Sequence, residues 1–268
     1  MSPVVRIDSP RNPKIKLARS LHSPKGRREA GLYLVEGPGA VAEALLYAPG
    51  IEWVAWCPDL CDALGDELAD AASQAKLEVL ECTREAFEAL SDTRSPQGIA
   101  AVLRIEPQGL DAIDISGGGA VLVMHDLRDP GNLGTIIRSA DAFGAVGVIL
   151  TGSCADPYEP KVVRATAGSL FHLPVVEAEW EQVAGWARDQ KVSVYATALE
   201  GSHAVGKVGI PKRVALVIGN EAHGLPQSIL QDATYTVTIP MSGRAESLNA
   251  AVAAGVVLFE AQRQRLAG

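Results

Sequence analysis

Two segments of the chain, residues 120–126 (AVLVMHD) and 213–219 (RVALVIG), are almost continuously apolar and rich in residues that favour β-strands. Runs of this kind, without polar alternation, are typical of strands that are covered on both faces. Segments in which apolar residues recur at helical spacing follow them, at 131–145 and 226–231. This alternation of strands and helices predicts an α/β fold with a parallel sheet.

The same alternation continues upstream and divides the chain into two α/β units. The first predicted unit spans residues 31–106, with four strands and three helices, the second helix beginning at a candidate cap, Asp59. A stretch with weak periodicity, residues 107–119, is the predicted linker, because Pro107 and a triple glycine punctuate its ends. The strands are expected at 31–35, 51–57, 77–82 and 98–103, and the helices at 37–48, 59–76 and 83–90.

The second predicted unit spans residues 120–268. Besides the two apolar strands, we expect strands at 146–150, 172–176, 191–197 and 233–241 and a helix at 180–190. Its last element is a predicted helix from Glu246 to about Arg265. Apolar side chains fall on one stripe of that helix, at Leu248, Val252, Val256 and Phe259.

Charge is distributed unevenly along the 268 residues, whose net charge is −8. Residues 1–30 hold eight Lys and Arg against two Asp and Glu, a net charge of +6. We interpret this segment as a basic N-terminal arm on an acidic body, which concentrates positive potential where a polyanion can be captured. The alternative is a solvated terminus that frays.

Several classes of protein are disfavoured by composition. The sequence contains no run of eighteen or more apolar residues, so a membrane span is not predicted. The N-terminal segment lacks the apolar core of a secretory signal. The four cysteines show no paired CxxC spacing, so we expect reduced thiols, no metal site and a cytoplasmic protein.

Polar, glycine-containing turns follow three of the predicted strands, where ligands bind in open α/β sheets. The first turn carries Asn132, and Arg138 lies about two helical turns further on. The second is the segment GNEAHG, residues 219–224. The third runs from Ile239-Pro240-Met241 through a short loop to Ser247-Leu248-Asn249. Taken singly, each could be an ordinary capped turn with surface charges.

In this order and spacing, the three segments resemble the sequence motifs of the SpoU/TrmH family of RNA 2′-O-methyltransferases. The first family motif is matched by Asn132, Gly134 and Arg138. The second is matched by Gly219, Asn220, Glu221 and Gly224, and the third by Ile239, Pro240, Met241, Ser247, Leu248 and Asn249. Where the family often has Val-Ser after the last asparagine, this chain has Ala250-Ala251, which removes one hydroxyl from the turn.

The resemblance covers nearly the whole chain. Residues 33–45 and 95–103 are similar to the start and end of the L30e-like RNA-binding domain that often precedes the catalytic domain. The segment 161–175 resembles the stretch between the family's first and second motifs, and it includes Arg164. The opening residues 8–21 are similar to the branch of the family that acts on ribosomal RNA.

This resemblance implies a C-terminal domain with a trefoil knot, in which the chain around residues 219–250 threads through an earlier loop. It also implies a homodimer, RNA as partner and S-adenosylmethionine (SAM) as cofactor. The implied cofactor-binding residues are Gly219, Asn220, Gly224, Ile239, Met241 and Leu248. The candidate RNA-binding residues are Arg11, Lys14, Lys16, Arg27, Arg28 and Arg164.

The implied catalytic residues are Arg138, Asn132, Glu221, Ser247 and Asn249. Arg138 is the residue that the family suggests as activator of the ribose hydroxyl. An arginine is a poor base, because lowering its pKa from above ~12 to near 7 would cost roughly 7 kcal/mol. We therefore expect Arg138 to clamp a phosphate and to stabilise developing alkoxide charge.

Other interpretations of the sequence were weighed against this one. The enzyme could act on transfer RNA or be a ribosome-directed antibiotic-resistance methylase. The chain could instead be a non-catalytic RNA-binding module with a decayed catalytic unit. A nicotinamide-dependent oxidoreductase is disfavoured, because the segment DPGNLGTIIR has only two glycines of the GxGxxG pattern.

Overall fold

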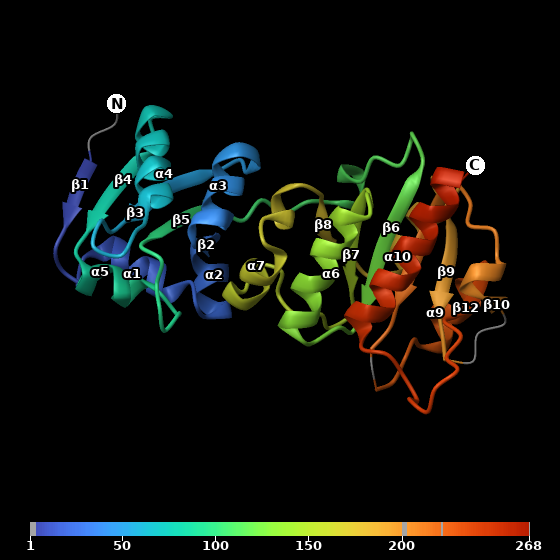
Figure 1. Cartoon of the computed structure of the whole chain (residues 1–268). Helices are drawn as coiled ribbons and strands as arrows, with labels where there is room; N and C mark the ends of the chain where they lie inside the picture. Colours follow the sequence, from blue (N-terminus) through green and yellow to red (C-terminus); the bar gives the residue numbers. More distant parts are fainter. Residues whose placement is uncertain (1–3, 200–202, 221, 268) are drawn as a thin grey trace. The chain divides into compact units, whose positions relative to one another are not determined.

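The computed structural model describes residues 4–199, 203–220 and 222–267. The chain forms two compact units, coloured by sequence in Figure 1. The first unit contains the chain up to Glu106 together with Tyr158–Phe171, and the second contains Pro107–Pro157 and the chain from His172 onward. The predicted linker therefore belongs to the second unit, where Ile113 and Ile115 are buried in the core.

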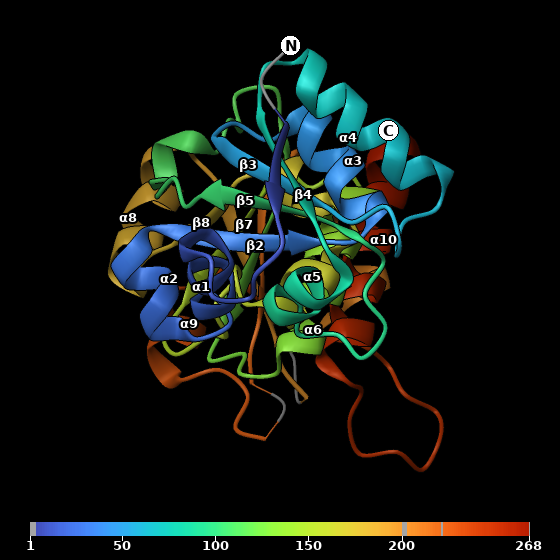
Figure 2. The ribbon, with the colours of Figure 1, turned by 90° about the vertical axis from the view of Figure 1, so that its left-hand side faces the viewer.

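The first unit is built on a five-stranded sheet with the order β1-β4-β3-β5-β2. Strands β1, β4 and β3 run parallel, whereas β5 is antiparallel to both β3 and β2. Helices pack against both faces of this sheet (Figure 2). The strands are β1 (Val4–Ile7), β2 (Leu32–Glu36), β3 (Ile51–Trp56), β4 (Glu78–Cys82) and β5 (Ile99–Arg104), and the helices are α1 (Pro13–Ser20), α2 (Pro24–Ala30), α3 (Pro38–Tyr47), α4 (Ala63–Gln74), α5 (Arg84–Leu90) and α7 (Pro160–Thr166).

Residues 4–30 do not form a separate arm, contrary to the interpretation of the charge pattern. β1 pairs in parallel with β4, and α1 and α2 cover the sheet. The side chains of Ile15, Ala18 and Leu21 have no exposed surface. The segment KIKLARSL carries apolar residues at helical spacing between its charges, and burial of those residues anchors the segment to the unit.

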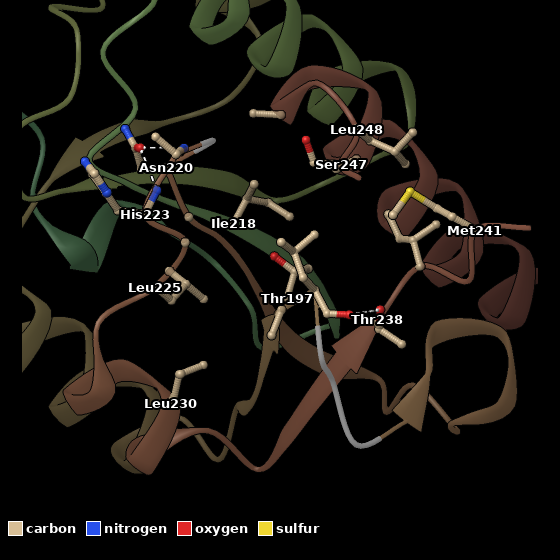
Figure 3. A pocket seen from close by; sticks show the side chains of 18 residues that line it. Thr197, Ile218, Asn220, His223, Leu225, Leu230, Thr238, Met241, Ser247 and Leu248 are labelled. Carbon is tan, nitrogen blue, oxygen red and sulfur yellow. Dashed lines mark hydrogen bonds between the residues drawn. The ribbon is translucent and has the colours of Figure 1, made fainter. Parts of the chain in front are cut away.

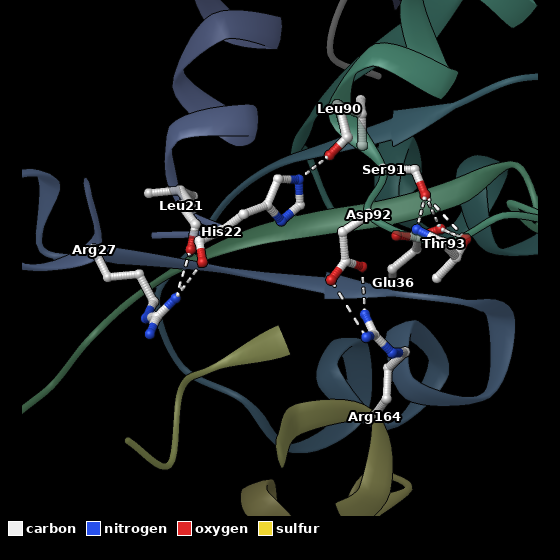
Figure 4. A network of polar contacts seen from close by, with 9 residues as sticks. All are labelled: Leu21, His22, Arg27, Glu36, Leu90, Ser91, Asp92, Thr93 and Arg164. Atoms are coloured by element: carbon white, nitrogen blue, oxygen red, sulfur yellow. Dashed lines mark hydrogen bonds and ion pairs between the residues drawn. The ribbon is translucent and has the colours of Figure 1, made fainter. Parts of the chain in front are cut away.

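Arg27 is among the most deeply buried side chains of this segment, with 1% of its surface exposed. Its guanidinium donates hydrogen bonds to the carbonyl oxygens of Leu21 (2.8 Å) and His22 (3.2 Å), as Figure 4 shows. Leu21 and His22 lie between α1 and α2, so Arg27 satisfies carbonyls that the end of α1 leaves without a helical partner. Its prediction as an RNA contact is wrong, because the guanidinium is not accessible.

The second unit is built on seven parallel strands in the order β10-β12-β9-β11-β6-β7-β8. The parallel sheet predicted from the apolar runs is confirmed, and these runs form the neighbouring strands β6 and β11. The strands are β6 (Gly119–His125), β7 (Gly147–Thr151), β8 (Val175–Glu177), β9 (Ser193–Thr197), β10 (His203–Ala204), β11 (Arg213–Ile218) and β12 (Tyr235–Thr238), and the helices are α6 (Pro130–Ala142), α8 (Trp180–Asp189), α9 (Gln227–Asp232) and α10 (Ala250–Ala267).

Helix starts differ most from the sequence-based expectation at α4 and α10, and the cap of α6 is Asp129. The cap of α4 is Asp62, whose side chain accepts from the Gly65 amide, and Asp59 lies before it in a turn. Asp129 caps α6 by accepting from the amide of Asn132 (2.7 Å), which leaves the Asn132 side chain for other contacts. α10 begins at Ala250, four residues after the predicted Glu246.

The apolar stripe identified on α10 is largely exposed. Val252 is 52% exposed, Val256 37% and Phe259 53%. The buried side of the helix carries four alanines together with Val257 and Leu258, and it packs against α6 and β11. The stripe of Val252, Val256 and Phe259 therefore lies on the opposite, outer face.

We expect Arg27 to contribute to stability rather than to RNA binding. Arg27→Ala should lower the free energy of unfolding by about 2–4 kcal/mol, since it leaves buried carbonyls without a donor. The exposed neighbour provides a control, and Arg28→Ala should change stability by no more than about 0.5 kcal/mol. Equilibrium urea unfolding followed by circular dichroism checks both values, and equal effects of the two substitutions would contradict the structural role of Arg27.

Candidate functional site

A pocket of about 360 Å³ lies at the carboxyl ends of β9, β11 and β12 (Figure 3). This volume is in the range of small-molecule sites, and most of the lining side chains are apolar. The pocket brings together residues of the second and third motifs, which are separated along the chain. All six predicted cofactor residues line it, namely Gly219, Asn220, Gly224, Ile239, Met241 and Leu248.

The second motif forms a tight turn that brings its own backbone to the pocket. Gly224 has φ of +65°, in the region that favours glycine, and its amide donates to the Asn220 carbonyl (2.9 Å). A Cβ atom on Gly219 would lie 2.5 Å from the carbonyl carbon and oxygen of Gly224. Glycine is therefore required at position 219 for the two ends of this turn to approach each other.

The side chain of Asn220 holds the turn in place. Its Oδ1 accepts from the amides of Ala222 (2.9 Å) and His223 (3.2 Å), and its Nδ2 donates to the carbonyl of Asp126 (2.9 Å). Asp126 follows β6, so the amide links the second motif to the turn of the first motif. Glu221, the motif's predicted catalytic carboxylate, lies outside the described residues.

The third motif links the pocket to the first motif. Ser247 and Leu248 line the pocket, and Asn249 caps α10 by accepting from the amides of Ala251 (2.9 Å) and Val252 (3.3 Å). The Nδ2 of Asn249 donates to Oδ1 of Asn132 over 3.0 Å. Residues 117 positions apart are thus joined by one hydrogen bond next to the pocket.

Arg138 lies on α6 and is exposed, and it does not line the pocket in a single copy of the chain. Its helix neighbours Ile136 and Ile137 face the core instead. The structure therefore brings Asn132, Ser247 and Asn249 to one edge of the sheet, whereas Arg138 is exposed and outside the pocket lining.

Sequence reasoning missed the contribution of β9. Thr197 ends β9, Leu199 follows it, and both line the pocket. Thr238 joins them from β12 by donating to the Leu199 carbonyl (3.0 Å). His223 also lines the pocket. The rule that ligands bind at the carboxyl ends of parallel strands would have identified the end of β9, since that strand was predicted.

The candidate RNA-binding residues of the first unit differ in exposure and in ion pairing. Arg11, Lys16 and Arg28 are exposed. Lys14 is paired with Glu78 and lies 5.8 Å from the ring of Trp53. Arg164 forms a two-pronged ion pair with Asp92, with nitrogen–oxygen distances of 2.5 and 3.3 Å (Figure 4). A partner that used Arg164 would have to compete with this carboxylate.

The cysteines lie away from the pocket lining and carry no signs of reactivity. Burial raises the pKa of the Cys61 thiol to about 11 and that of Cys82 to about 12. It also raises the pKa of Cys57 and Cys154, so all four thiols are protonated at neutral pH.

Within residues 4–199, 203–220 and 222–267, no group of three or more His, Cys, Asp and Glu side chains is arranged to hold a metal ion. No helix in the same ranges is long and apolar enough to cross a membrane.

Two family models match the chain, one for each unit. The SpoU rRNA methylase family matches residues 119–259, and the MRM3-like substrate-binding domain matches residues 12–101. A 23S rRNA (guanosine(2553)-2′-O)-methyltransferase of Bacillus subtilis is 33% identical over 95% of this chain and 98% of its own length. A 23S rRNA (uridine(2479)-2′-O)-methyltransferase of Streptomyces viridochromogenes is 32% identical over 100% of this chain and 95% of its own length.

Solved structures show the same architecture. The AdoMet-bound rRNA methyltransferase from Sinorhizobium meliloti superposes with a TM-score of 0.87 at 36% identity, covering 97% of this chain and 98% of that one. The SpoU methyltransferase AviRb from Streptomyces viridochromogenes, in complex with AdoMet, superposes with a TM-score of 0.88 at 31% identity, covering 96% of this chain and all of that one. From the three motifs that meet at one sheet edge, and from these matches along nearly its whole length, the chain belongs to the SpoU rRNA methylase family.

Proposed function

We propose that this protein transfers a methyl group from SAM to a ribose 2′-hydroxyl of 23S ribosomal RNA. The observation that carries the proposal is the convergence of all three motifs at one edge of the sheet, through Asn220–Asp126 and Asn249–Asn132. The relatives named for 23S rRNA methylation support the substrate. Free cysteine thiols are typical of a reducing compartment and support a cytoplasmic location.

The pocket residues fit SAM. Ile218, Leu225 and Leu248 form apolar walls that suit an adenine ring, and the turn at Gly219 brings backbone groups to the pocket without a side chain in the way. Bound SAM supplies an electrophilic methyl group on a sulfonium. The chain's own residues hold the turns in place, exclude water from the apolar walls and position the ribose.

Arg138 is proposed as the cation that holds the RNA phosphate next to the target ribose. Its guanidinium is exposed on α6, where a planar group can form two hydrogen bonds to a phosphate. A fixed positive charge there stabilises the alkoxide that develops as the 2′-hydroxyl loses its proton. The Asn132–Asn249 pair and Ser247 are proposed to orient the ribose, and Glu221 is proposed to act with them.

The first unit is proposed to supply affinity for RNA. Arg11, Lys16 and Arg28 are exposed on or next to α1 and α2, and Lys14 lies among them. Because α1 and α2 are packed on the sheet, these cations are held on a folded surface, which lowers the entropy lost when they bind phosphates.

We further infer a homodimer and a trefoil crossing in the second unit. The exposed stripe of Val252, Val256 and Phe259 supports the dimer, since apolar side chains that share one helix face are typical of an interface. Phe143 extends the stripe, with its ring centroid 6.0 Å from that of Phe259. Two contacts support the crossing, that of Asn220 with Asp126 directly after β6 and that of Asn249 with Asn132 in the first turn of α6.

Ribose methylation of purified RNA tests the function directly. We expect the protein, with SAM, to methylate one ribose in 23S rRNA from cells that lack it, as mapped by resistance of the 2′-O-methylated linkage to alkaline cleavage. Methylation confined to transfer RNA would overturn the substrate. SAM binding without methylation of any RNA fraction would indicate a non-catalytic RNA-binding module.

Arg138 substitutions test the proposed charge role. Arg138→Ala should reduce the single-turnover rate of methyl transfer by about 10²–10³, the usual effect of losing a preorganised charge donor. Arg138→Lys should retain part of the rate because a cation remains, and neither change should alter SAM affinity. Full activity of Arg138→Ala would refute the role. A lysine variant with unreduced turnover and a lower pH optimum would indicate a true base instead.

A charge placed on the stripe tests the dimer. Phe259→Glu should halve the molecular mass measured by light scattering after gel filtration, because burying an unpaired carboxylate at an interface is strongly unfavourable. Phe259 is half exposed in one copy, so the fold should survive. Leu46→Glu, at a residue 73% exposed in the first unit, is the matched control and should leave the mass unchanged. A Phe259→Glu variant of unchanged mass would contradict the stripe as the interface.

A further inference from the structure

Asp126, the residue directly after β6, has an unusual backbone conformation. Its φ is +54°, in the left-handed region that non-glycine residues rarely adopt, although aspartate tolerates it better than most. Two hydrogen bonds hold it there. Its amide donates to the Thr151 carbonyl (3.1 Å), and its carboxylate Oδ1 accepts from the Ser153 amide (2.7 Å).

The neighbouring strand end is shaped to receive this carboxylate. Gly152 has φ of +66°, and a Cβ atom there would lie 2.4 Å from Oδ1 of Asp126. His125 lies alongside, with Nδ1 2.8 Å from the Thr151 hydroxyl and Nε2 3.7 Å from Oδ2 of Asp126. The carboxylate therefore ties the end of β6 to the loop that follows β7.

The conformation of Asp126 determines where its carbonyl oxygen points. That oxygen accepts the hydrogen bond from Nδ2 of Asn220 (2.9 Å). Asn220 uses its other side-chain atom, Oδ1, to accept from the amides of Ala222 and His223, and so shapes the pocket turn. A continuous set of hydrogen bonds thus runs from the Ser153 amide through Asp126 to the wall of the pocket.

We propose that Asp126 is a positioning residue for the cofactor. Its carboxylate holds the left-handed backbone, and its carbonyl in turn anchors the Asn220 side chain, which accepts from the amides of Ala222 and His223. Asp126 does not line the pocket, so it acts on SAM through Asn220 and not by contact. The inference rests on the proposal that this pocket binds SAM.

Three substitutions distinguish how the Asp126 carboxylate, the Asp126 backbone conformation and the Asn220 amide contribute to SAM binding. Asp126→Asn keeps an oxygen acceptor and a side chain that tolerates the left-handed conformation, so the Kd for SAM should stay within about twofold. Asp126→Gly permits the conformation but removes the acceptor, and should weaken SAM binding about 3- to 10-fold. Asn220→Asp keeps Oδ1 but places an oxygen against the Asp126 carbonyl, and should weaken binding about 5- to 20-fold.

The double variant tests whether the two residues act together. If Asp126 acts through Asn220, adding Asp126→Gly to Asn220→Asp should weaken SAM binding by no more than about twofold beyond the Asn220→Asp change alone. Kd is measured by calorimetric titration of the full chain with SAM, and thermal stability is measured separately without SAM.

Arg213→Ala is the matched control for stability. Arg213 opens β11 at the opposite edge of the sheet and donates to the carbonyls of Gln190 (3.0 Å) and Ser116 (2.9 Å). Its loss should lower thermal stability and leave the Kd for SAM unchanged. Unchanged SAM affinity of Asp126→Gly, or an equal loss of affinity in Arg213→Ala, would overturn the positioning role. A wild-type chain that does not bind SAM would instead overturn the assignment of the pocket.

Discussion

The parallel pairing of β11 between β9 and β6 is the constraint on which the candidate site depends. Parallel strands end at the same edge, so the turns that follow these strands must lie together whatever their separation along the chain. Both faces of β11 are buried, and a shift in its register would misplace apolar side chains such as Leu216 and Val217 in a packed core. The hydrophobic core therefore fixes the strand ends, and the polar contacts at the edge join turns that the sheet has already brought close.

Those polar contacts are hydrogen bonds made by the side-chain amides of two asparagines, and they are not ion pairs. Asn220 and Asn249 each use both ends of their amide group. The oxygen accepts from backbone amides of the residue's own turn, and the nitrogen donates to an oxygen of the segment after β6, the Asp126 carbonyl for Asn220 and the Asn132 side chain for Asn249. An amide can donate and accept at once, which a carboxylate or an ammonium group cannot do when ionised. Asparagine at these positions is thus explained by geometry alone, before any direct contact with a ligand is considered.

The sequence was informative where a pattern has one physical cause. Continuous apolar runs have few explanations other than doubly covered strands, and β6 and β11 were predicted on that basis. Three ordered motifs indicated which strand ends meet. Helix starts were less predictable, since Asp59 and Asp62 are equivalent candidates in sequence and only the turn at Cys57–Cys61 determines that Asp62 caps α4.

The charge pattern of residues 1–30 and the apolar stripe of α10 were less informative, because each pattern is compatible with two different structures. The cations of residues 1–30 suggested a basic arm that captures a polyanion, yet Arg27 is buried and donates to the carbonyls of Leu21 and His22, which the distribution of charge alone does not reveal. On α10, the sequence placed Val252, Val256 and Phe259 on one stripe without indicating whether that stripe faces the core. The buried side of the helix carries four alanines together with Val257 and Leu258 and packs against α6 and β11, while the stripe lies on the outer face. A periodic pattern identifies which residues share a face, but the packing of neighbouring elements determines which face turns inward. Because the core is already filled by the other side of α10, the exposed stripe is left for the contact with a second copy that we propose.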